Sequence, residues 1–135
     1  MKEYPKVGAA VWVRREGKVL LGVRKGIGAG TWCAPGGHVE MYEPAKECAI
    51  RETQEEAGIE ISNIKLIVPL ETIWEEVGKH WITLMYVADW KSGEPIAQPE
   101  EFEKWGWFEW DNLPTPLFYP TEQFVKSGIN PLAIL

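Results

Sequence analysis

The segment Gly37–Ile59 reads GHVEMYEPAKECAIRETQEEAGI and contains the strongest helix signal in the chain. Pro44 suits the first position of a helix because its fixed φ is already helical, and Gly58 suits the position that follows the last turn. Nearly all residues between them are good helix formers. The segment therefore predicts a helix that begins at or next to Glu43 and ends before Gly58.

The second half of this predicted helix carries three carboxylates on one face. Glu52 lies three residues before Glu55 and four before Glu56, so the side chains share an arc of roughly 100°. Like charges at these spacings destabilise a helix by roughly 0.2–0.5 kcal/mol per pair. The three glutamates also lie near the C-terminal end of the helix, where the helix dipole favours cations. A solvated acidic face is the ordinary alternative. The helix stop and the upstream pair Gly36-Gly37 favour instead a site for a hard cation, Mg²⁺ or Mn²⁺.

Strand patterns flank the helix and predict a mixed sheet with helices packed against it, an α+β arrangement. Pro35-Gly36-Gly37 predicts a tight turn, and Ala49, Ile50, Thr53 and Ala57 form the helix arc expected to face the sheet. We find no repeat or linker, so residues 1–135 are expected to form a single domain. The expected strands are Val7–Arg14, Lys18–Arg24, Trp32–Ala34, Ile64–Ile73, His80–Trp90 and Trp105–Trp110, with a second helix at Thr121–Lys126 capped by Thr121.

The overall composition limits the partners. The 135 residues carry a formal net charge of −6, which argues against a nucleic-acid polymer as the main partner. A small anionic substrate is still compatible, because a bound divalent cation reverses the local charge. Cys33 and Cys48 form no CxxC pair and predict reduced thiols. No segment has the length and apolarity of a membrane span or signal peptide, so we expect a cytoplasmic protein with no membrane partner.

The spacing of the charged residues resembles the signature box of the Nudix hydrolases. The one departure is Thr53, which stands where the family usually has a bulky aliphatic residue. The resemblance implies a Nudix-like α/β/α sandwich with a central mixed β-sheet, and Mg²⁺-dependent hydrolysis of a diphosphate linkage in a nucleotide. It is carried by Gly37, Glu43 after five further residues, Arg51 and Glu52 after seven more, and then Gln54, Glu55, Glu56, Gly58 and Ile59.

The resemblance also implies roles for the box residues. The metal ligands would be Glu52, Glu55 and Glu56, together with the Gly37 carbonyl. Arg51 would orient a glutamate through a charge-assisted hydrogen bond, and Glu43 would brace the junction of loop and helix. The proton acceptor stays open among Glu52, Glu55 and an acid in the stretch 100–103.

Segments outside the box resemble the MutT-like nucleoside triphosphate diphosphatases, and most of all the branch with the human thiopurine-nucleotide diphosphatase. These segments are residues 20–26, 28–30, 35–38, 105–114, 117–119 and 128–131. The resemblance implies release of a (d)NMP and pyrophosphate from a (d)NTP. Ala34 and Tyr119 replace a larger aliphatic residue and a tryptophan of that relative, so its base preference is not transferred. The implied substrate-binding residues are Arg24, Ala34, His38, Thr83, Phe118 and Tyr119.

Two other functions remain as alternatives. One is hydrolysis of a nucleotide sugar, ADP-ribose or another nucleoside diphosphate derivative. The other is a non-catalytic nucleotide-sensing module, which the intact box disfavours. The similar branch forms homodimers, and an exposed stripe among the eight tryptophans would suit such a contact. For most of these tryptophans, however, we expect a place in the core.

Overall fold

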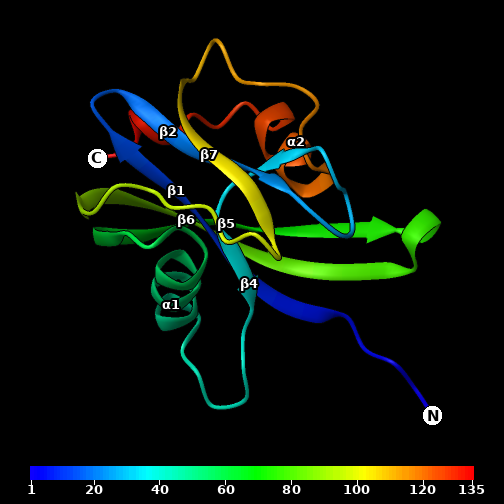
Figure 1. Cartoon of the computed structure of the whole chain (residues 1–135). Helices are drawn as coiled ribbons and strands as arrows, with labels where there is room; N and C mark the ends of the chain where they lie inside the picture. Colours follow the sequence, from blue (N-terminus) through cyan, green and yellow to red (C-terminus); the bar gives the residue numbers. More distant parts are fainter.

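In the computed structural model, which describes all 135 residues, a mixed β-sheet separates two helices (Figure 1). The sheet order is β3-β2-β1-β6-β5, with β4 paired to β1 and β7 paired to β2. Strands β1 and β6 run parallel, and the other pairs are antiparallel. The predicted α/β/α sandwich is therefore confirmed. The elements are β1 (Lys6–Arg15), β2 (Lys18–Arg24), β3 (Trp32–Cys33), β4 (Gly36–His38), α1 (Ala45–Ala57), β5 (Glu60–Trp74), η1 (Glu75–Val77), β6 (Lys79–Ser92), β7 (Phe102–Glu109), α2 (Tyr119–Lys126) and η2 (Pro131–Ala133).

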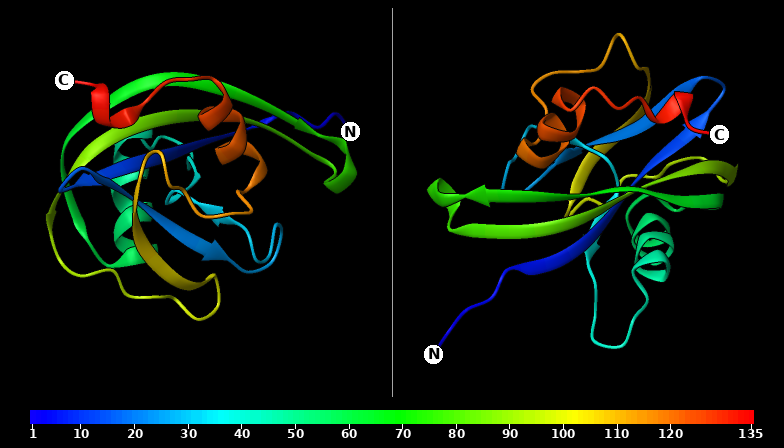
Figure 2. Two further views of the ribbon diagram at one scale, coloured as in Figure 1. Left: turned by 90° about the horizontal axis from the view of Figure 1, so that it is seen from above. Right: turned by 180° about the vertical axis from the view of Figure 1, so that it is seen from behind.

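Alternating side chains of β1 supply the cores on both faces of the sheet. Val11 and Val13 belong to the cluster that contains Cys48, Ala49 and Ala57 of α1. On the other face, a second cluster contains Trp12 of β1 and Phe124 of α2. Figure 2 shows α1 and α2 on opposite sides of the sheet. Neither helix is long and apolar enough to cross a membrane.

Helix α1 agrees with the prediction except at two points. Its N-cap is Pro44 rather than Glu43, and Gly58 ends it in the left-handed conformation with φ 71°. Ala49, Thr53 and Ala57 are buried as expected, but Ile50 is 36% exposed. The prediction for Ile50 is wrong because the buried face is centred nearer to Cys48 and Glu56, which leaves Ile50 beyond its edge.

The tight turn predicted at residues 35–37 is also wrong. Gly36 and Gly37 belong to β4 and pair with Ala10 and Ala9 of β1. A Cβ atom on Gly36 would lie 2.3 Å from the Ala9 carbonyl oxygen. The glycine is needed because two backbones approach closely, not because the chain reverses.

Most element boundaries differ from the predicted ones by one to four residues. Strand β5 begins at Glu60 and β7 at Phe102, three or four residues earlier than expected. Helix α2 begins at Tyr119, and its N-cap is Phe118 without a side-chain cap. Thr121 is therefore not the predicted cap, and it lies buried inside the first turn. All eight tryptophans are buried or half-buried, so they form no exposed stripe.

Candidate active site

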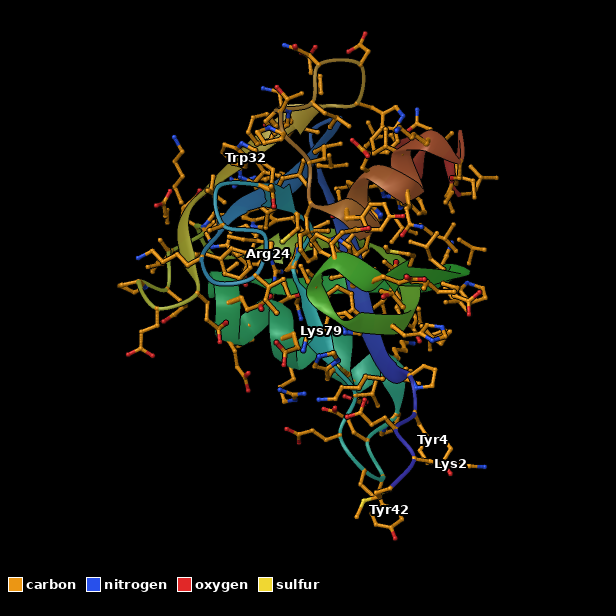
Figure 3. The ribbon with its side chains drawn as sticks, turned by 90° about the vertical axis from the view of Figure 1, so that its right-hand side faces the viewer. Lys2, Tyr4, Arg24, Trp32, Tyr42 and Lys79 are labelled. Atoms are coloured by element: carbon orange, nitrogen blue, oxygen red, sulfur yellow. The ribbon has the colours of Figure 1, made fainter.

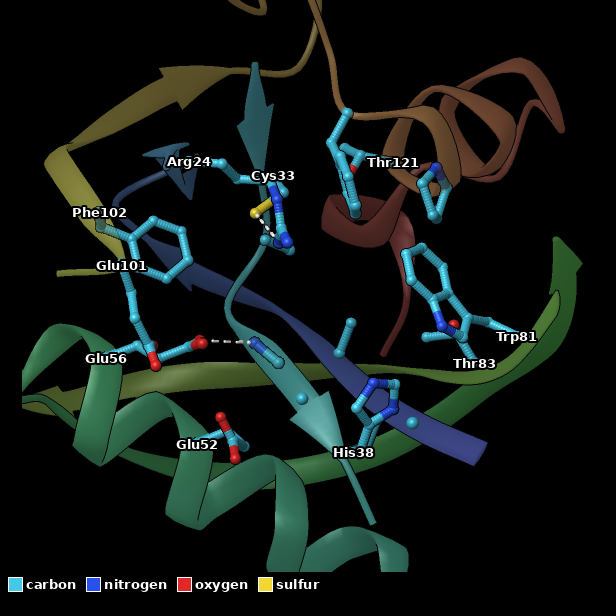
Figure 4. A pocket seen from close by; sticks show the side chains of 18 of the residues that line it. Arg24, Cys33, His38, Glu52, Glu56, Trp81, Thr83, Glu101, Phe102 and Thr121 are labelled. Carbon is cyan, nitrogen blue, oxygen red and sulfur yellow. Dashed lines mark hydrogen bonds between the residues drawn. The ribbon is translucent and has the colours of Figure 1, made fainter. Parts of the chain in front are cut away.

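A cavity of about 580 Å³ lies between β4, α1, β6 and the start of α2 (Figure 4). In this view, Glu52, Glu56 and Glu101 lie at one side, and His38, Trp81 and Thr83 lie at the other. The cavity brings together eight of the predicted site residues, namely Arg24, Ala34, Gly37, His38, Glu52, Glu56, Thr83 and Phe118. Four others do not line it, namely Glu43, Arg51, Glu55 and Tyr119.

Glu56 is the most deeply placed carboxylate of the cavity. Its side chain comes from the last turn of α1 and is only 7% exposed. Its Oε1 accepts a hydrogen bond of 2.9 Å from the backbone N–H of Gly36. Burial raises the pKa of Glu56 to about 9, the Gly36 N–H opposes this rise, and the negative charges of Glu52 and Glu101 add to it. No basic side chain forms an ion pair with Glu56.

Glu52 lies one turn earlier on α1 and closes the same side of the cavity. Its side chain is 16% exposed, and Arg51 Nη1 donates to its Oε1 over 2.8 Å. Burial raises the pKa of Glu52, and Arg51 partly opposes this rise. A Cβ atom on Gly37 would lie 2.4 Å from the Glu52 carboxyl carbon. Because Gly37 has no side chain, the Glu52 carboxylate can lie close to the backbone of β4.

Arg51 connects the carboxylates of the box. Its guanidinium donates to both Glu43 oxygens, with Nε at 2.7 Å and Nη2 at 3.1 Å. Its Nη1 also donates to Glu55, over 3.2 Å. These bonds from Arg51, with one from the Glu40 N–H, hold the pKa of Glu43 well below its usual range. Glu43 thereby joins the loop before α1 to the middle of the helix.

Two predicted residues point away from the cavity. The side chain of Glu55 is 58% exposed and lies against Arg51. Tyr119 packs edge-to-face on Trp74, with ring centroids 5.3 Å apart. In this arrangement Glu55 and Tyr119 flank the site rather than line it.

The aromatic side of the cavity is organised around Phe118. The Arg24 guanidinium lies 3.8 Å from the centroid of the Phe118 ring, and Arg24 also donates to the Ile27 carbonyl. A Cβ atom on Gly28 would lie 2.6 Å from Phe118, so the glycine loop packs directly on this ring. The centroid of the Trp81 ring lies 6.0 Å from that of the Phe118 ring. Arg24 and the glycine loop therefore hold the Phe118 ring in place.

Some residues that line the cavity were not predicted from the sequence. Trp81 and Phe102 line the cavity, as does the buried thiol of Cys33, and none was assigned to the site. The alternation of Trp81 with Thr83 on one strand is a signal that could have placed Trp81 beside the predicted Thr83. Glu101, which the acidic stretch 100–103 had indicated only as a group, does line the cavity.

The donor set at the acidic side fits a hard divalent cation. Glu56 is a buried carboxylate whose only hydrogen-bond donor is a backbone N–H, and Glu52 and Glu101 lie beside it. An isolated buried negative charge is costly unless a positive charge compensates for it. Oxygen ligands of this kind suit Mg²⁺ or Mn²⁺ better than Zn²⁺. These residue types therefore fit the metal that the resemblance implies, but no three His, Cys, Asp or Glu side chains are gathered closely enough here to form a complete ligand set.

The fold and this site define a Nudix hydrolase domain. Residues 4–127 match the family model for the NUDIX domain, and the chain belongs to the Nudix family. The crystal structure of a MutT NUDIX hydrolase from Burkholderia pseudomallei has a TM-score of 0.86 and 36% sequence identity, covering 92% of this chain and 98% of that one. A UDP-X diphosphatase structure, at 21% identity and a TM-score of 0.69, shares the fold over 95% of this chain and 66% of its own.

Curated relatives of this chain are named NAD-capped RNA hydrolase NudC. The NAD-capped RNA hydrolase NudC of Chromobacterium violaceum is 34% identical over 113 residues, which is 82% of this chain and 41% of the relative. NudC of Pseudomonas aeruginosa is 31% identical over 116 residues, or 84% of this chain and 40% of the relative. The chain thus spans about two-fifths of the length of these relatives.

Proposed function

We propose that this chain is a Mg²⁺-dependent pyrophosphohydrolase that converts a (d)NTP into a (d)NMP and pyrophosphate, with Mn²⁺ also suitable. The observation that carries the proposal is the division of one cavity into an acidic side and an aromatic side. A cation at the acidic side would hold the phosphates, and the aromatic side would hold the nucleoside. The 36% identity to a MutT NUDIX hydrolase over nearly the whole of both chains supports a hydrolase activity of this kind.

The acidic side would hold the metal through Glu52, Glu56 and the Gly37 carbonyl. Glu55 keeps its predicted place among the ligands, although Arg51 now binds it outside the cavity. When bound, the cation supplies charge neutralisation at the phosphates and lowers the pKa of a water molecule. Arg51 orients Glu52 and is itself fixed by Glu43.

Glu101 is the proton acceptor that the geometry favours among the three open alternatives. It lines the cavity beside Glu56, and its side chain has no hydrogen-bond or ion-pair partner, so it is free to take a proton from water. Glu52 is engaged by Arg51, and Glu55 lies outside the cavity. Glu101→Gln is expected to lower kcat by roughly 10²–10⁴ with little change in KM. A kcat within tenfold of the wild type would exclude this role.

The aromatic side would bind the base by stacking. Stacking on an aromatic side chain contributes about 1–3 kcal/mol per base, and Phe118 offers its ring to the cavity. Thr83, Ala34 and His38 are the other predicted contacts, and all three line the same space. Arg24 supports the Phe118 ring in this structure, and the resemblance also implies that Arg24 lies close to the sugar or phosphates of a bound substrate.

A second candidate is hydrolysis of the diphosphate between two nucleotides. The names of the NudC relatives favour it, although this chain covers only about two-fifths of their length. No feature of the cavity favours a nucleotide sugar or ADP-ribose over these two. A purely sensing role is disfavoured because Arg51, Glu52, Glu55 and Glu56 are all present.

A substrate panel with product analysis tests the proposal. Canonical and oxidised dNTPs, NTPs, NAD, ADP-ribose and nucleotide sugars would be incubated with Mg²⁺ and wild type or Glu56→Gln. Pyrophosphate from a triphosphate supports the first candidate, and two monophosphates from NAD would favour the second. No metal-dependent turnover of any nucleotide would overturn both. Light scattering on the same samples tests the predicted homodimer.

A further inference from the structure

Residues 93–101 connect β6 to β7 without a helix or strand of their own, and we name this segment the acidic strap. The strap carries Glu100 and Glu101 to the cavity, where both residues belong to the lining. Its first half is attached to the end of α1, because the Ile96 N–H donates to the Ala57 carbonyl over 2.9 Å. The attachment of the second half is a separate matter, and this half places the carboxylates.

The second half of the strap is a tight turn that ends at Glu101. The Glu101 N–H donates to the Gln98 carbonyl over 3.0 Å and closes the turn. Apart from the bonds of the turn itself, both hydrogen bonds that join residues 97–101 to the rest of the chain come from Lys25. The Lys25 backbone N–H donates to the Glu101 carbonyl over 2.9 Å, and its ammonium group donates to the Pro99 carbonyl. One residue therefore attaches the turn at two points.

Lys25 occupies the position where the pairing of β2 with β7 ends. Arg24 is opposite Phe102 in this antiparallel pair, so the next residue along β2 comes opposite Glu101. In Figure 3, Arg24 marks the point where β2 ends and the glycine loop, residues 25–31, begins. Arg24 contacts the Phe118 ring at the aromatic side of the cavity. Two consecutive residues thus support opposite sides of the same cavity.

The Glu101 side chain depends on this attachment for its position. It has no hydrogen-bond or ion-pair partner, so only its backbone determines where the carboxylate lies. Lys25 also lines the cavity, and direct contact with the substrate phosphates is the alternative role for its ammonium group. In this structure the ammonium group is bound to the strap instead, through the Pro99 carbonyl. The contacts therefore favour support of Glu101 over contact with the substrate.

We propose that Lys25 is a positioning residue that fixes the Glu101 carboxylate at the acidic side of the cavity. The inference rests on the proposed function, in which Glu101 takes a proton from water. Proton transfer needs the two heavy atoms within about 2.6–3.2 Å, and a misplacement of about 1 Å can lower the rate roughly 100-fold. Lys25 acts through the backbone of the strap and touches no reacting atom.

Steady-state kinetics separate support of Glu101 from binding of phosphate. Lys25→Met keeps an unbranched apolar stem and removes the ammonium group. With Mg²⁺ and each of the four canonical dNTPs, this variant is expected to lower the kcat of pyrophosphate release roughly 10- to 100-fold and to leave KM unchanged. Lys25→Arg keeps a donor for the Pro99 carbonyl and should recover most of the loss. Lys18→Met is the matched control, because Lys18 lies exposed at the start of β2 and forms no side-chain hydrogen bond.

A double-mutant cycle tests whether Lys25 acts through Glu101. In a Glu101→Gln background, adding Lys25→Met should lower kcat no further, because the carboxylate that Lys25 positions is already lost. The same loss in both backgrounds would overturn the proposal, since it would show an effect independent of Glu101. A raised KM with an unchanged kcat in Lys25→Met would also overturn it and assign the ammonium group to the phosphates.

Hydrogen exchange measures the attachment without turnover. The Glu101 amide donates within the turn, so its exchange reports how often the turn opens. Lys25→Met should speed this exchange roughly 2- to 12-fold, which corresponds to the loss of one hydrogen bond, and Lys18→Met should not change it. Unchanged exchange in Lys25→Met would overturn the proposal. Faster exchange in a protein that turns over no dNTP would instead refute the proposed function alone.

Discussion

Replacing Glu56 by glutamine should stabilise the protein in the absence of divalent cations. The pKa of Glu56 is about 9 in the folded protein, because the carboxylate is buried. Its ordinary value is 4.5, so the folded state favours the protonated form. The stability that this proton confers is complete below pH 4.5 and is lost as the pH rises from there to about 9. At pH 7 the loss amounts to about 3 kcal/mol, at 1.36 kcal/mol for each pH unit above 4.5.

Glutamine keeps the shape of the protonated acid and does not titrate. It can still accept the hydrogen bond from the Gly36 N–H through its amide oxygen. In buffer with a chelator at pH 7, Glu56→Gln is therefore expected to raise the free energy of unfolding by about 2–3 kcal/mol, or the melting temperature by roughly 10 °C. Excess Mg²⁺ should stabilise the wild type, by about 2.7 kcal/mol at a hundred times its Kd, and the variant much less.

Urea unfolding between pH 5 and pH 9, with and without Mg²⁺, measures both effects. Glu47→Gln is the matched control, because Glu47 lies exposed on the same helix and the substitution removes the same charge. This control should change stability by less than about 0.5 kcal/mol at every pH. The reasoning is refuted if Glu56→Gln is no more stable than wild type in chelator at pH 7, or if the two pH profiles run parallel. Equal stabilisation of both proteins by Mg²⁺ would remove Glu56 from the metal site.

Three further predictions follow from the packing of α1 and α2. Gly37→Ala should fold but displace the Glu52 carboxylate and lower kcat/KM by roughly 100-fold, whereas Gly58→Ala should cost about 1 kcal/mol of stability at its φ of 71° and leave kcat/KM unchanged. Equal activity losses in a steady-state assay would contradict the difference. Arg51→Lys should weaken Mg²⁺ activation by roughly 10- to 100-fold, since lysine cannot replace the forked contacts, and an unchanged Mg²⁺ titration would exclude this role. Phe124→Ala should lower the free energy of unfolding in urea by about 3–5 kcal/mol, because the ring is fully buried, and a loss below 1 kcal/mol would contradict it.

The box helix was predictable because its signals are local. Pro44, Gly58 and the spacing of the glutamates act within a few residues, and the structure places α1 where they indicate. The role of Gly36 was not predictable in this way. A glycine can permit a turn or permit close approach of another strand, and only the pairing of β4 with β1 decides between them.

The aromatic half of the cavity depends on contacts between distant segments, which explains why it was predicted only in part. Phe118 and Thr83 were expected in the site from the resemblance, but Trp81 was not. Its position follows from the register of β1 against β6, a tertiary property that no local pattern specifies. The exposure of Tyr119 likewise depends on its packing against Trp74.

A helical wheel places the three glutamates in one arc, but it does not show that their exposure and their charged partners differ in the folded protein. The Glu55 side chain is 58% exposed and the Glu52 side chain 16% exposed, whereas Glu56 is buried, with only 7% of the residue exposed. Arg51 compensates the first two, whereas the third forms no ion pair and is affected only at a distance by the positive charge of Arg24. A cation from solution is therefore expected to gain the most binding free energy beside Glu56, because this carboxylate is the most desolvated of the three. Glu52 and Glu55 share the Arg51 guanidinium, so the helix combines one buried carboxylate that has no ion pair within the protein with two that already have one.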